Sequence, residues 1–440
     1  MKKLLFILVV GFSWSSVSAQ TNTFSLQQAI DYAMKNDNSL RNAQLNIKDA
    51  AGQIKEIRAI GMPKLSAKVD YQYFIELPTS LIPANAFDPT APEGQFIEAQ
   101  FGTSNSLTAS LDFSMLLFDG TYLVGLEAAK LYKDFAGLQV KQAEKEVKDK
   151  VVDAYVSTLI FEVTKKTFDD NIKNLTGLIK ETKELYKEGF AEQLDVDRLE
   201  YSLQSIKTEL ANLNRQEEQV KNLLKFTMSY PLDQDIQLVD DIDMLLVNEF
   251  ALANDEALDL NNRPELNVLN KSLDLQALDI KQYQRGYLPN LAAFASYQYS
   301  VQGNNLFDNP PSFPMSLVGL QLNVPIFDGF EKRAKIERAR VSQEKSLNQK
   351  KDLVRAINLE VETARISYTN AFERVGNSKK SVELAQKIYD TTKTKYKEGV
   401  GSSFELIQAE SELYQSQNSY QQALYDYLKS KADLKKALGK

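Results

Sequence analysis

Residues 107–120 read LTASLDFSMLLFDG, and this stretch contains the two patterns that decide the fold. Apolar and polar residues alternate from Leu107 to Met115, which is the period of a β-strand with one apolar and one wet face. Asp119 and Gly120 follow where the strand passes into a long helical stretch, because glycine allows a bend and aspartate favours a helix start. The stretch therefore predicts a strand joined directly to a helix.

The same pattern returns in the second half of the chain. Residues 116–120 (LLFDG) correspond to residues 325–329 (PIFDG), shifted by 209 positions. Asp328 and Gly329 then form a second strand-to-helix bend. A repeat of this kind predicts two structural copies within one chain.

A second pair of matching segments lies further along each half, with LYKEG at 185–189 and KYKEG at 395–399. We therefore divide the mature chain into two structural repeats, 20–228 and 262–440, separated by residues 229–261. The separating segment is rich in aspartate but lacks the ligand spacing and central glycine of a calcium loop. We interpret it as an equatorial segment wrapped around the helices, with no metal site.

Four segments show the strand pattern, at about 64–77, 105–118, 288–301 and 315–327. Their length and period are typical of transmembrane β-strands with one lipid face and one wet face. Aromatic residues near their ends fit two interfacial belts, with Tyr71, Tyr73, Tyr297 and Tyr299 at one level and Phe118 and Phe327 at the other. A pair of soluble hairpins with one buried face is the alternative interpretation.

Four strands cannot close a barrel on their own, and open sheet edges are not tolerated in lipid. Two copies of the chain would give an eight-stranded barrel, whose interior is filled by side chains. Three copies would give twelve strands, enough for an aqueous bore. A pore therefore favours a homotrimer in contact with membrane lipid.

Heptad patterns predict long, closely packed helices. In the last helical stretch a large residue recurs every seven positions, with a small residue at the other seam position. The large residues are Leu406, Leu413, Tyr420, Tyr427 and Leu434, and the small ones are Ala409, Ser416, Ala423, Ser430 and Ala437. A similar seam from Leu199 to Leu224 is interrupted by Glu217. A periplasmic coiled-coil scaffold without a pore would explain these seams but would leave the four strands unexplained.

The N-terminus and the composition restrict the class of protein. The first residues predict a signal peptide over residues 1–19. It consists of Lys2 and Lys3, the apolar run at 4–12 and the small residues 17–19 (VSA). The absence of cysteine and histidine excludes thiol nucleophiles, histidine bases and the usual zinc sites. No nucleophile is assembled with a base, so we expect neither an enzyme such as a periplasmic hydrolase nor a cofactor. The mature net charge of −9 disfavours nucleic-acid binding.

In these features the chain resembles the TolC-like outer-membrane efflux protein family. The resemblance covers nearly all of residues 20–440. It rests on the duplication, the two Phe-Asp-Gly bends, the sequence NRPEL at 262–266 and the paired turns near 186–196 and 396–405. It implies a mixed α and β membrane protein. The expected fold is a trimeric twelve-stranded transmembrane β-barrel, four strands per protomer, continuing into a long α-helical periplasmic barrel.

The resemblance also implies a location and a function. The protein is expected in the outer membrane with a long periplasmic portion, as the passive channel of a tripartite efflux or type I secretion system. Its expected partners are a periplasmic adaptor (membrane fusion) protein and an inner-membrane RND or ABC pump. The sequence does not distinguish drug or metal efflux from protein secretion, because the pump and adaptor choose the cargo.

Roles at the two turns follow from the resemblance alone. Adaptor docking is implied for Gly189, Phe190, Ala191, Glu192, Gly399, Val400, Gly401 and Ser402. Asp195 matches the position that ties neighbouring helices at a closed tunnel entrance. Glu405 and Gln408 match two acidic positions that form constriction rings, and only Glu405 keeps the charge. An ordinary helix-start carboxylate is the alternative interpretation of Asp195 and Glu405.

Overall fold

The computed structural model describes residues 22–87, 89–242 and 258–439. The expected signal peptide and part of the 229–261 segment lie outside the described residues. The chain divides into two compact units. The helical unit comprises the residues up to Leu45, Gly137–Val268 and those from Lys350 onward, and the strand unit comprises Asn46–Ala136 and Leu269–Gln349. Each unit therefore takes residues from both sequence repeats.

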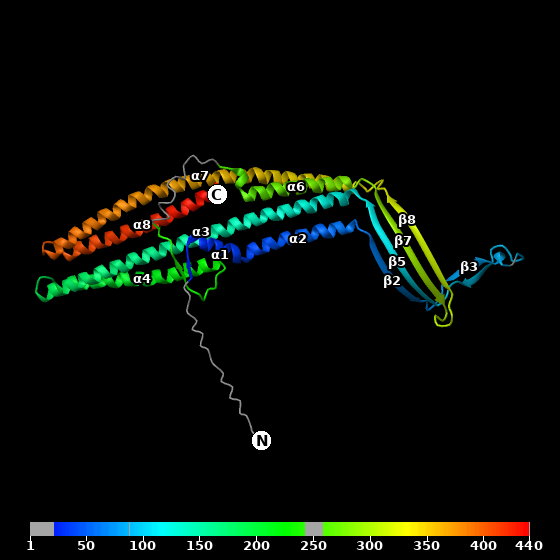
Figure 1. Cartoon of the computed structure of the whole chain (residues 1–440), viewed down its shortest axis with the longest axis horizontal. Helices are drawn as coiled ribbons and strands as arrows, with labels where there is room; N and C mark the ends of the chain where they lie inside the picture. Colours follow the sequence, from blue (N-terminus) through cyan, green and yellow to red (C-terminus); the bar gives the residue numbers. More distant parts are fainter. Residues whose placement is uncertain (1–21, 88, 243–257, 440) are drawn as a thin grey trace, which may run out of the picture. The chain divides into compact units, whose positions relative to one another are not determined.

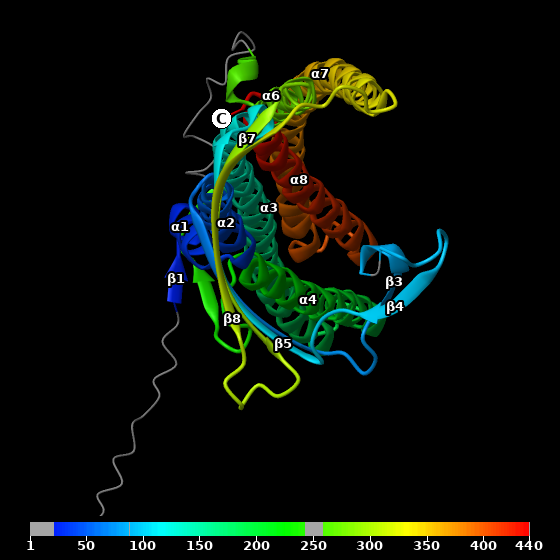
Figure 2. The ribbon, with the colours of Figure 1, turned by 90° about the vertical axis from the view of Figure 1, so that its right-hand side faces the viewer.

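The strand unit contains a four-stranded antiparallel sheet (Figure 1). Its strands, in the order in which they lie side by side, are β2 (Lys64–Tyr73), β5 (Asn105–Phe118), β7 (Asn290–Gly303) and β8 (Ser312–Asn323). The central β5–β7 pair joins the two repeats, and the sheet is curved (Figure 2). The helices α2 (Asn38–Ile60) and α6 (Pro264–Arg285) lead into β2 and β7.

The four predicted strands are present, and their ends agree with the prediction to within four residues. β8 ends at Asn323 rather than near residue 327, because Pro325 has no backbone N–H for the ladder. The long connection between β2 and β5 spans residues 74–104 and includes several prolines. It contains a second hairpin, made of β3 (Thr79–Pro83), η1 (Ala84–Ala86) and β4 (Phe96–Gln100). Its short strands carry too few alternating residues to stand out in the sequence.

The helical unit is built from two antiparallel helix pairs (Figure 1). They are α3 (Gly120–Lys187) with α4 (Gln193–Thr227), and α7 (Glu331–Lys397) with α8 (Ser403–Ala437). All four helices contribute to one apolar core near their turns, which includes Leu178, Leu199, Tyr389 and Leu406. Nearly all of the predicted seam residues of α8 are buried, which confirms the heptad pattern.

Glu217 was predicted to interrupt the seam of α4, but its side chain is buried in that seam. Its carboxylate lies 3.1 Å from Lys165 Nζ of α3 and 2.8 Å from Lys221 Nζ. Lys221 also pairs with Glu162 at 2.9 Å. A buried charge is tolerated when it is paired in this way. The apparent break is therefore an ion-pair contact between α3 and α4.

The N-terminal segment is fixed to the segment that separates the repeats. β1 (Asn22–Phe24) pairs in parallel with β6 (Ile236–Leu238). The Asp240 carboxylate accepts hydrogen bonds from the Leu26 N–H at 2.7 Å and the Tyr155 hydroxyl at 2.9 Å. Asp240 therefore anchors the start of α1 (Leu26–Asn36) to α3. Within the described ranges, no three Asp or Glu residues are grouped so as to hold a metal ion.

None of the helices in the described part of the chain combines the length and the hydrophobicity needed to cross a bilayer.

Candidate functional site

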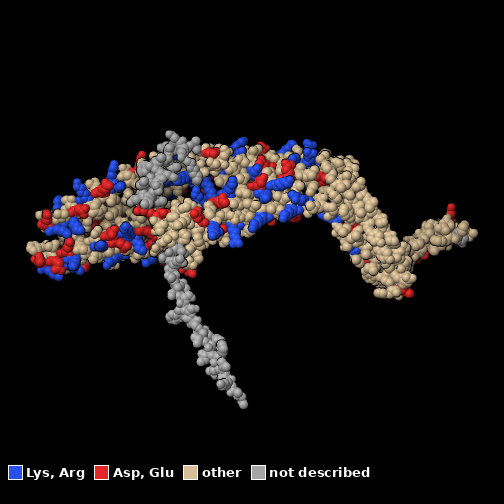
Figure 3. Space-filling model, in the orientation of Figure 1, with Lys and Arg blue, Asp and Glu red and all other residues tan. Residues whose placement is uncertain are grey.

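The register of the sheet places most of its apolar residues on one face. Leu65, Phe113, Ala295 and Val318 form one row across the four strands, and the rows on either side are similar. Many of these side chains are exposed in the single chain. In Figure 3 the sheet shows almost no charged atoms, whereas the helices carry many. An apolar face of this kind suits contact with lipid.

The opposite face of the sheet is largely polar and internally hydrogen-bonded. Ser296 Oγ donates to Asp112 Oδ1 at 2.6 Å, and the Thr108 and Ser300 hydroxyls lie 3.2 Å apart. Lys68 pairs with Asp70 at 2.8 Å. Because successive side chains of a strand point to opposite faces, one sheet presents an apolar wall and a polar wall.

The two edge strands each have one side without a partner in the described chain, since β2 pairs only with β5 and β8 only with β7. The Gln302 N–H donates to the Pro311 carbonyl at 3.2 Å, which fixes the alternation of the β7–β8 ladder. Leu320 and its alternate neighbours therefore direct their backbone groups to the open edge. Unpaired backbone groups cannot be left in lipid, so these edges require another strand.

The two predicted bends lie between strand and helix. Their aspartates have the same role, but their glycines do not. Asp119 accepts hydrogen bonds from the Thr121 and Tyr122 N–H groups at 2.7 and 3.1 Å. Asp328 likewise accepts hydrogen bonds from two backbone N–H groups beyond it. A Cβ at Gly120 would lie 3.0 Å from the Leu288 side chain, whereas Gly329 has a φ of +64°. Glycine serves close packing at the first bend and a left-handed backbone at the second.

Both helix turns have the same backbone motif. The Phe190 N–H donates to the Leu185 carbonyl at 2.8 Å, and the Val400 N–H donates to the Lys395 carbonyl at 3.0 Å. Gly189 and Gly399 have φ values of +80° and +75°. This is the Schellman pattern, which requires a left-handed residue after the last helical turn.

The turns expose apolar side chains at matching positions. Phe190 is 78% exposed and Val400 is 75% exposed. Leu194 and Phe404, four residues further along, are also exposed. Exposed apolar residues at equivalent places of both repeats form a candidate contact surface, which we call the tip patch.

Asp195 and Glu405 have the same local role at the starts of α4 and α8. Asp195 accepts a hydrogen bond from the Glu192 N–H at 3.0 Å. Glu405 accepts a hydrogen bond from the Ser402 N–H at 3.4 Å, and Ser402 Oγ accepts one from the Glu405 N–H at 3.2 Å. Both acids therefore complete capping boxes. Gln408 lies on the exposed side of α8 and donates to Glu412 at 3.2 Å.

Two contacts between the helix pairs near the turns did not follow from the sequence. Arg198 of α4 donates to Ser403 Oγ of α8 at 3.3 Å, and Lys397 pairs with Glu181 of α3 at 2.6 Å. Both join the first repeat to the second. Charged residues on helix surfaces are common, so only the packing of the helices singles these residues out.

Glu410, in the second turn of α8, carries a buried carboxyl group. Its side chain is 1% exposed, and it accepts hydrogen bonds from Tyr414 at 2.7 Å and Ser202 at 3.1 Å. Burial raises the pKa of Glu410 above its ordinary value of 4.5, against the lowering effect of these hydroxyls and of Lys393.

The raised pKa of Glu410 predicts a pH-dependent stability. Because the folded state binds this proton more tightly than the unfolded state, stability should increase as pH falls through the folded-state pKa, and level off below about 4.5. Glu410→Gln should raise the melting temperature at neutral pH and weaken this dependence. Thermal unfolding of both proteins, followed by circular dichroism between pH 5 and 8, measures how the melting temperature depends on pH. Equal pH profiles for both proteins would contradict the prediction.

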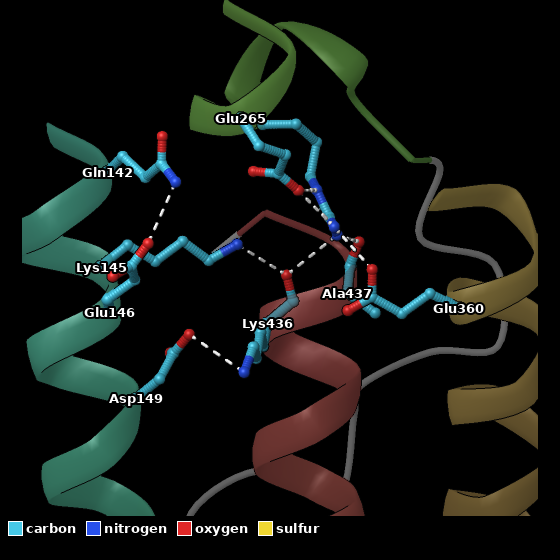
Figure 4. A network of polar contacts seen from close by, with 9 residues as sticks. Gln142, Lys145, Glu146, Asp149, Glu265, Glu360, Lys436 and Ala437 are labelled. Carbon is cyan, nitrogen blue, oxygen red and sulfur yellow. Dashed lines mark hydrogen bonds and ion pairs between the residues drawn. The ribbon is translucent and has the colours of Figure 1, made fainter. Parts of the chain in front are cut away.

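A second polar cluster lies around Arg263, within the NRPEL sequence at 262–266, and Figure 4 labels its partners Glu265, Glu360 and Ala437. Its side chain is 4% exposed, with Nε 2.6 Å from Glu265 and an Nη 2.6 Å from Glu360. The other Nη donates to the Ala437 carbonyl at 2.5 Å. Lys145 Nζ donates a hydrogen bond at 3.0 Å to the carbonyl of Lys436, the residue before Ala437. Arg263 therefore joins the start of α6 to α7 and to the end of α8.

Comparisons with known proteins agree on the kind of protein. The family model described as "Outer membrane efflux protein" matches residues 29–228 and 257–440. The chain is 25% identical to outer membrane protein TolC of Escherichia coli, covering all of this chain and 87% of that protein. It is 29% identical to the alkaline protease secretion protein AprF of Pseudomonas aeruginosa over 40% of this chain and 37% of that one. The crystal structure of the outer membrane protein VceC of Vibrio cholerae matches with a TM-score of 0.70 at 17% identity, over 94% and 96% of the two chains.

Proposed function

Because the chain belongs to the outer membrane efflux protein family, whose members are outer-membrane channels, we propose that three copies assemble into one channel for efflux or secretion. We infer the trimer from the four-stranded sheet, which has one mainly apolar face, one mainly polar face and two open edges. Pairing β8 of each copy with β2 of the next gives twelve strands around an aqueous bore. The apolar faces then meet lipid and the polar faces line the bore.

The scaffold alternative accounts for less of the molecule. A coiled coil without a pore uses the seams of α4 and α8 but gives no role to an exposed sheet with opposed faces. It would also leave the edges of β2 and β8 open to aggregation. Planar bilayer recordings separate the two proposals. The purified protein should give uniform conductance steps, and a protein without bilayer activity would favour the scaffold.

The proposed partners follow from the tip patch and from the family. A periplasmic adaptor docks at the two turns, where Phe190, Leu194, Val400 and Phe404 offer exposed apolar side chains. An inner-membrane RND or ABC pump then supplies the cargo. The names of the relatives include both TolC and a protease secretion protein, so they support either efflux or secretion.

The starts of α4 and α8 form the proposed entrance to the bore. Its closed state depends on Asp195 and Glu405, which fix these helix starts by capping. Opening separates the helix pairs at the turns and breaks contacts such as Arg198–Ser403. Gln408 lacks a charge, so the entrance holds one ring of acidic residues instead of two.

Asp195→Ala is expected to raise the single-channel conductance, because it removes the capping-box hydrogen bond from the Glu192 N–H and loosens the start of α4. Asp195→Asn is the matched control, since its side-chain oxygen can still accept the Glu192 N–H. It should keep the low conductance. Unchanged conductance in Asp195→Ala would remove Asp195 from the gate, and equal increases in both variants would assign the effect to charge.

A further inference from the structure

The connection between β2 and β5 ends in an exposed apolar hairpin. Leu81 of β3 is 65% exposed, and Phe96 of β4 is 57% exposed. The strands pair so that Ile82 lies opposite Ile97 and Pro83 opposite Phe96. Large apolar side chains therefore occur on both faces of the hairpin. Their exposure shows that one chain does not cover them.

The outer end of β8 has a reversed pattern. Phe313, Met315 and Leu317 are paired with Ser300, Gln298 and Ser296, so they lie on the polar face of the sheet. Phe313 is 54% exposed and Met315 is 49% exposed. Ser312 and Ser316 lie on the apolar face instead. From Val318 onward the apolar residues return to the apolar face. Phe313, Met315 and Leu317 form what we call the inner row.

Both surfaces lie at the same end of the sheet. The hairpin connection leaves β2 at Tyr73 and enters β5 at Asn105, which is paired with Gly303 at the end of β7. The inner row begins one residue from Ser312, which is paired with Val301. However, the hairpin follows the edge strand β2, whereas the inner row lies on the other edge strand, β8, because the strand order is β2-β5-β7-β8. Figure 2 shows the hairpin standing clear of the sheet, on the inner side of its curve.

Ring closure brings these surfaces together. If β8 of one copy lies beside β2 of the next, the hairpin that follows β2 stands next to the neighbour's inner row. We propose that the β3–β4 hairpin of each subunit packs onto the inner row of the adjacent subunit, forming three clasps inside the outer mouth. This inference rests on the proposed trimer. It covers two exposed apolar surfaces with one contact and explains why the outer end of β8 is apolar on the wet side.

Charge disfavours lipid as the occupant. Residues 74–104 contain no lysine or arginine, and Glu76, Glu93 and Glu98 are acidic. Anionic lipid headgroups attract basic segments, so this connection offers them no complementary charge. A second copy of the chain needs none, because its inner row is uncharged.

Disulfide trapping tests the clasp cleanly, because the natural chain has no cysteine. Phe96→Cys and Ile97→Cys lie on opposite faces of the hairpin, and each is combined with Met315→Cys. Oxidation of the detergent-extracted protein should convert at least one double variant into covalent dimers and trimers on non-reducing gels. Ser316→Cys, on the other face of β8, replaces Met315→Cys in the control and should leave monomers.

The remaining outcomes overturn the clasp. Monomers in both double variants would show that the hairpin and the inner row do not meet. A cross-link within one chain would place the hairpin on its own β8. Dimers from a single hairpin cysteine would mean that the hairpins meet one another. The mass of each variant in mild detergent is measured in parallel, so a trimer without cross-links rejects only the clasp, whereas a monomer rejects the trimer itself.

Discussion

Arg263→Ala is expected to destabilise the helical unit by about 3 kcal/mol, the lower end of the usual cost of breaking a buried ion pair, because Glu265 and Glu360 are partly exposed. The side chain joins Glu265, Glu360 and the Ala437 carbonyl in one cluster. Its removal leaves two carboxylates without this cation and the Ala437 carbonyl without this donor. Urea unfolding followed by far-ultraviolet circular dichroism measures the effect.

Arg263→Lys is the matched control for charge. A lysine keeps the positive charge but has one ammonium group, which cannot reach three acceptors held in the plane of a guanidinium. We expect the free energy of unfolding of this variant to lie between those of the wild type and the alanine variant. An alanine variant as stable as the wild type would contradict the role given to this cluster.

Leu320→Arg is expected to prevent assembly in the outer membrane. Leu320 lies on the apolar face of β8, in register with Ala293 of β7. An arginine facing lipid costs up to about 2–4 kcal/mol, depending on its depth in the membrane, and a trimer would contain three. The amount of trimer recovered from outer membranes should fall strongly.

The adjacent residue provides the control for Leu320→Arg. Gln321 belongs to the polar face, so Gln321→Arg should assemble normally and shift the ion selectivity of the bore towards anions. Assembly of both variants in equal amounts would contradict the assignment of the two faces. Loss of both would show that this part of β8 tolerates no arginine for another reason.

Local patterns in the sequence predicted much of this fold because their causes are local. The alternation in β5 and the heptads of α8 depend on periodicity, and the ends of α3 and α7 depend on Gly189 and Gly399. The capping box at the start of α8 could also be predicted, since Ser402 and Glu405 have the required spacing. Where a proline ends a strand, as Pro325 does after β8, the prediction was too long.

Features that depend on a neighbouring helix or strand could not be predicted. Glu410 looks like a surface residue of α8 until α4 is placed against it. Glu217 looked like a break in a seam until Lys165 was placed opposite. The inner row of β8 required the register with β7, because a short apolar stretch has no preferred face of its own.

The mass of the protein extracted from outer membranes in mild detergent, corrected for bound detergent, tests the central claim most directly. Four strands per chain with two open edges predict a particle of three mature chains. A monomer in detergent, or recovery of the protein from the soluble periplasm, would contradict the shared barrel.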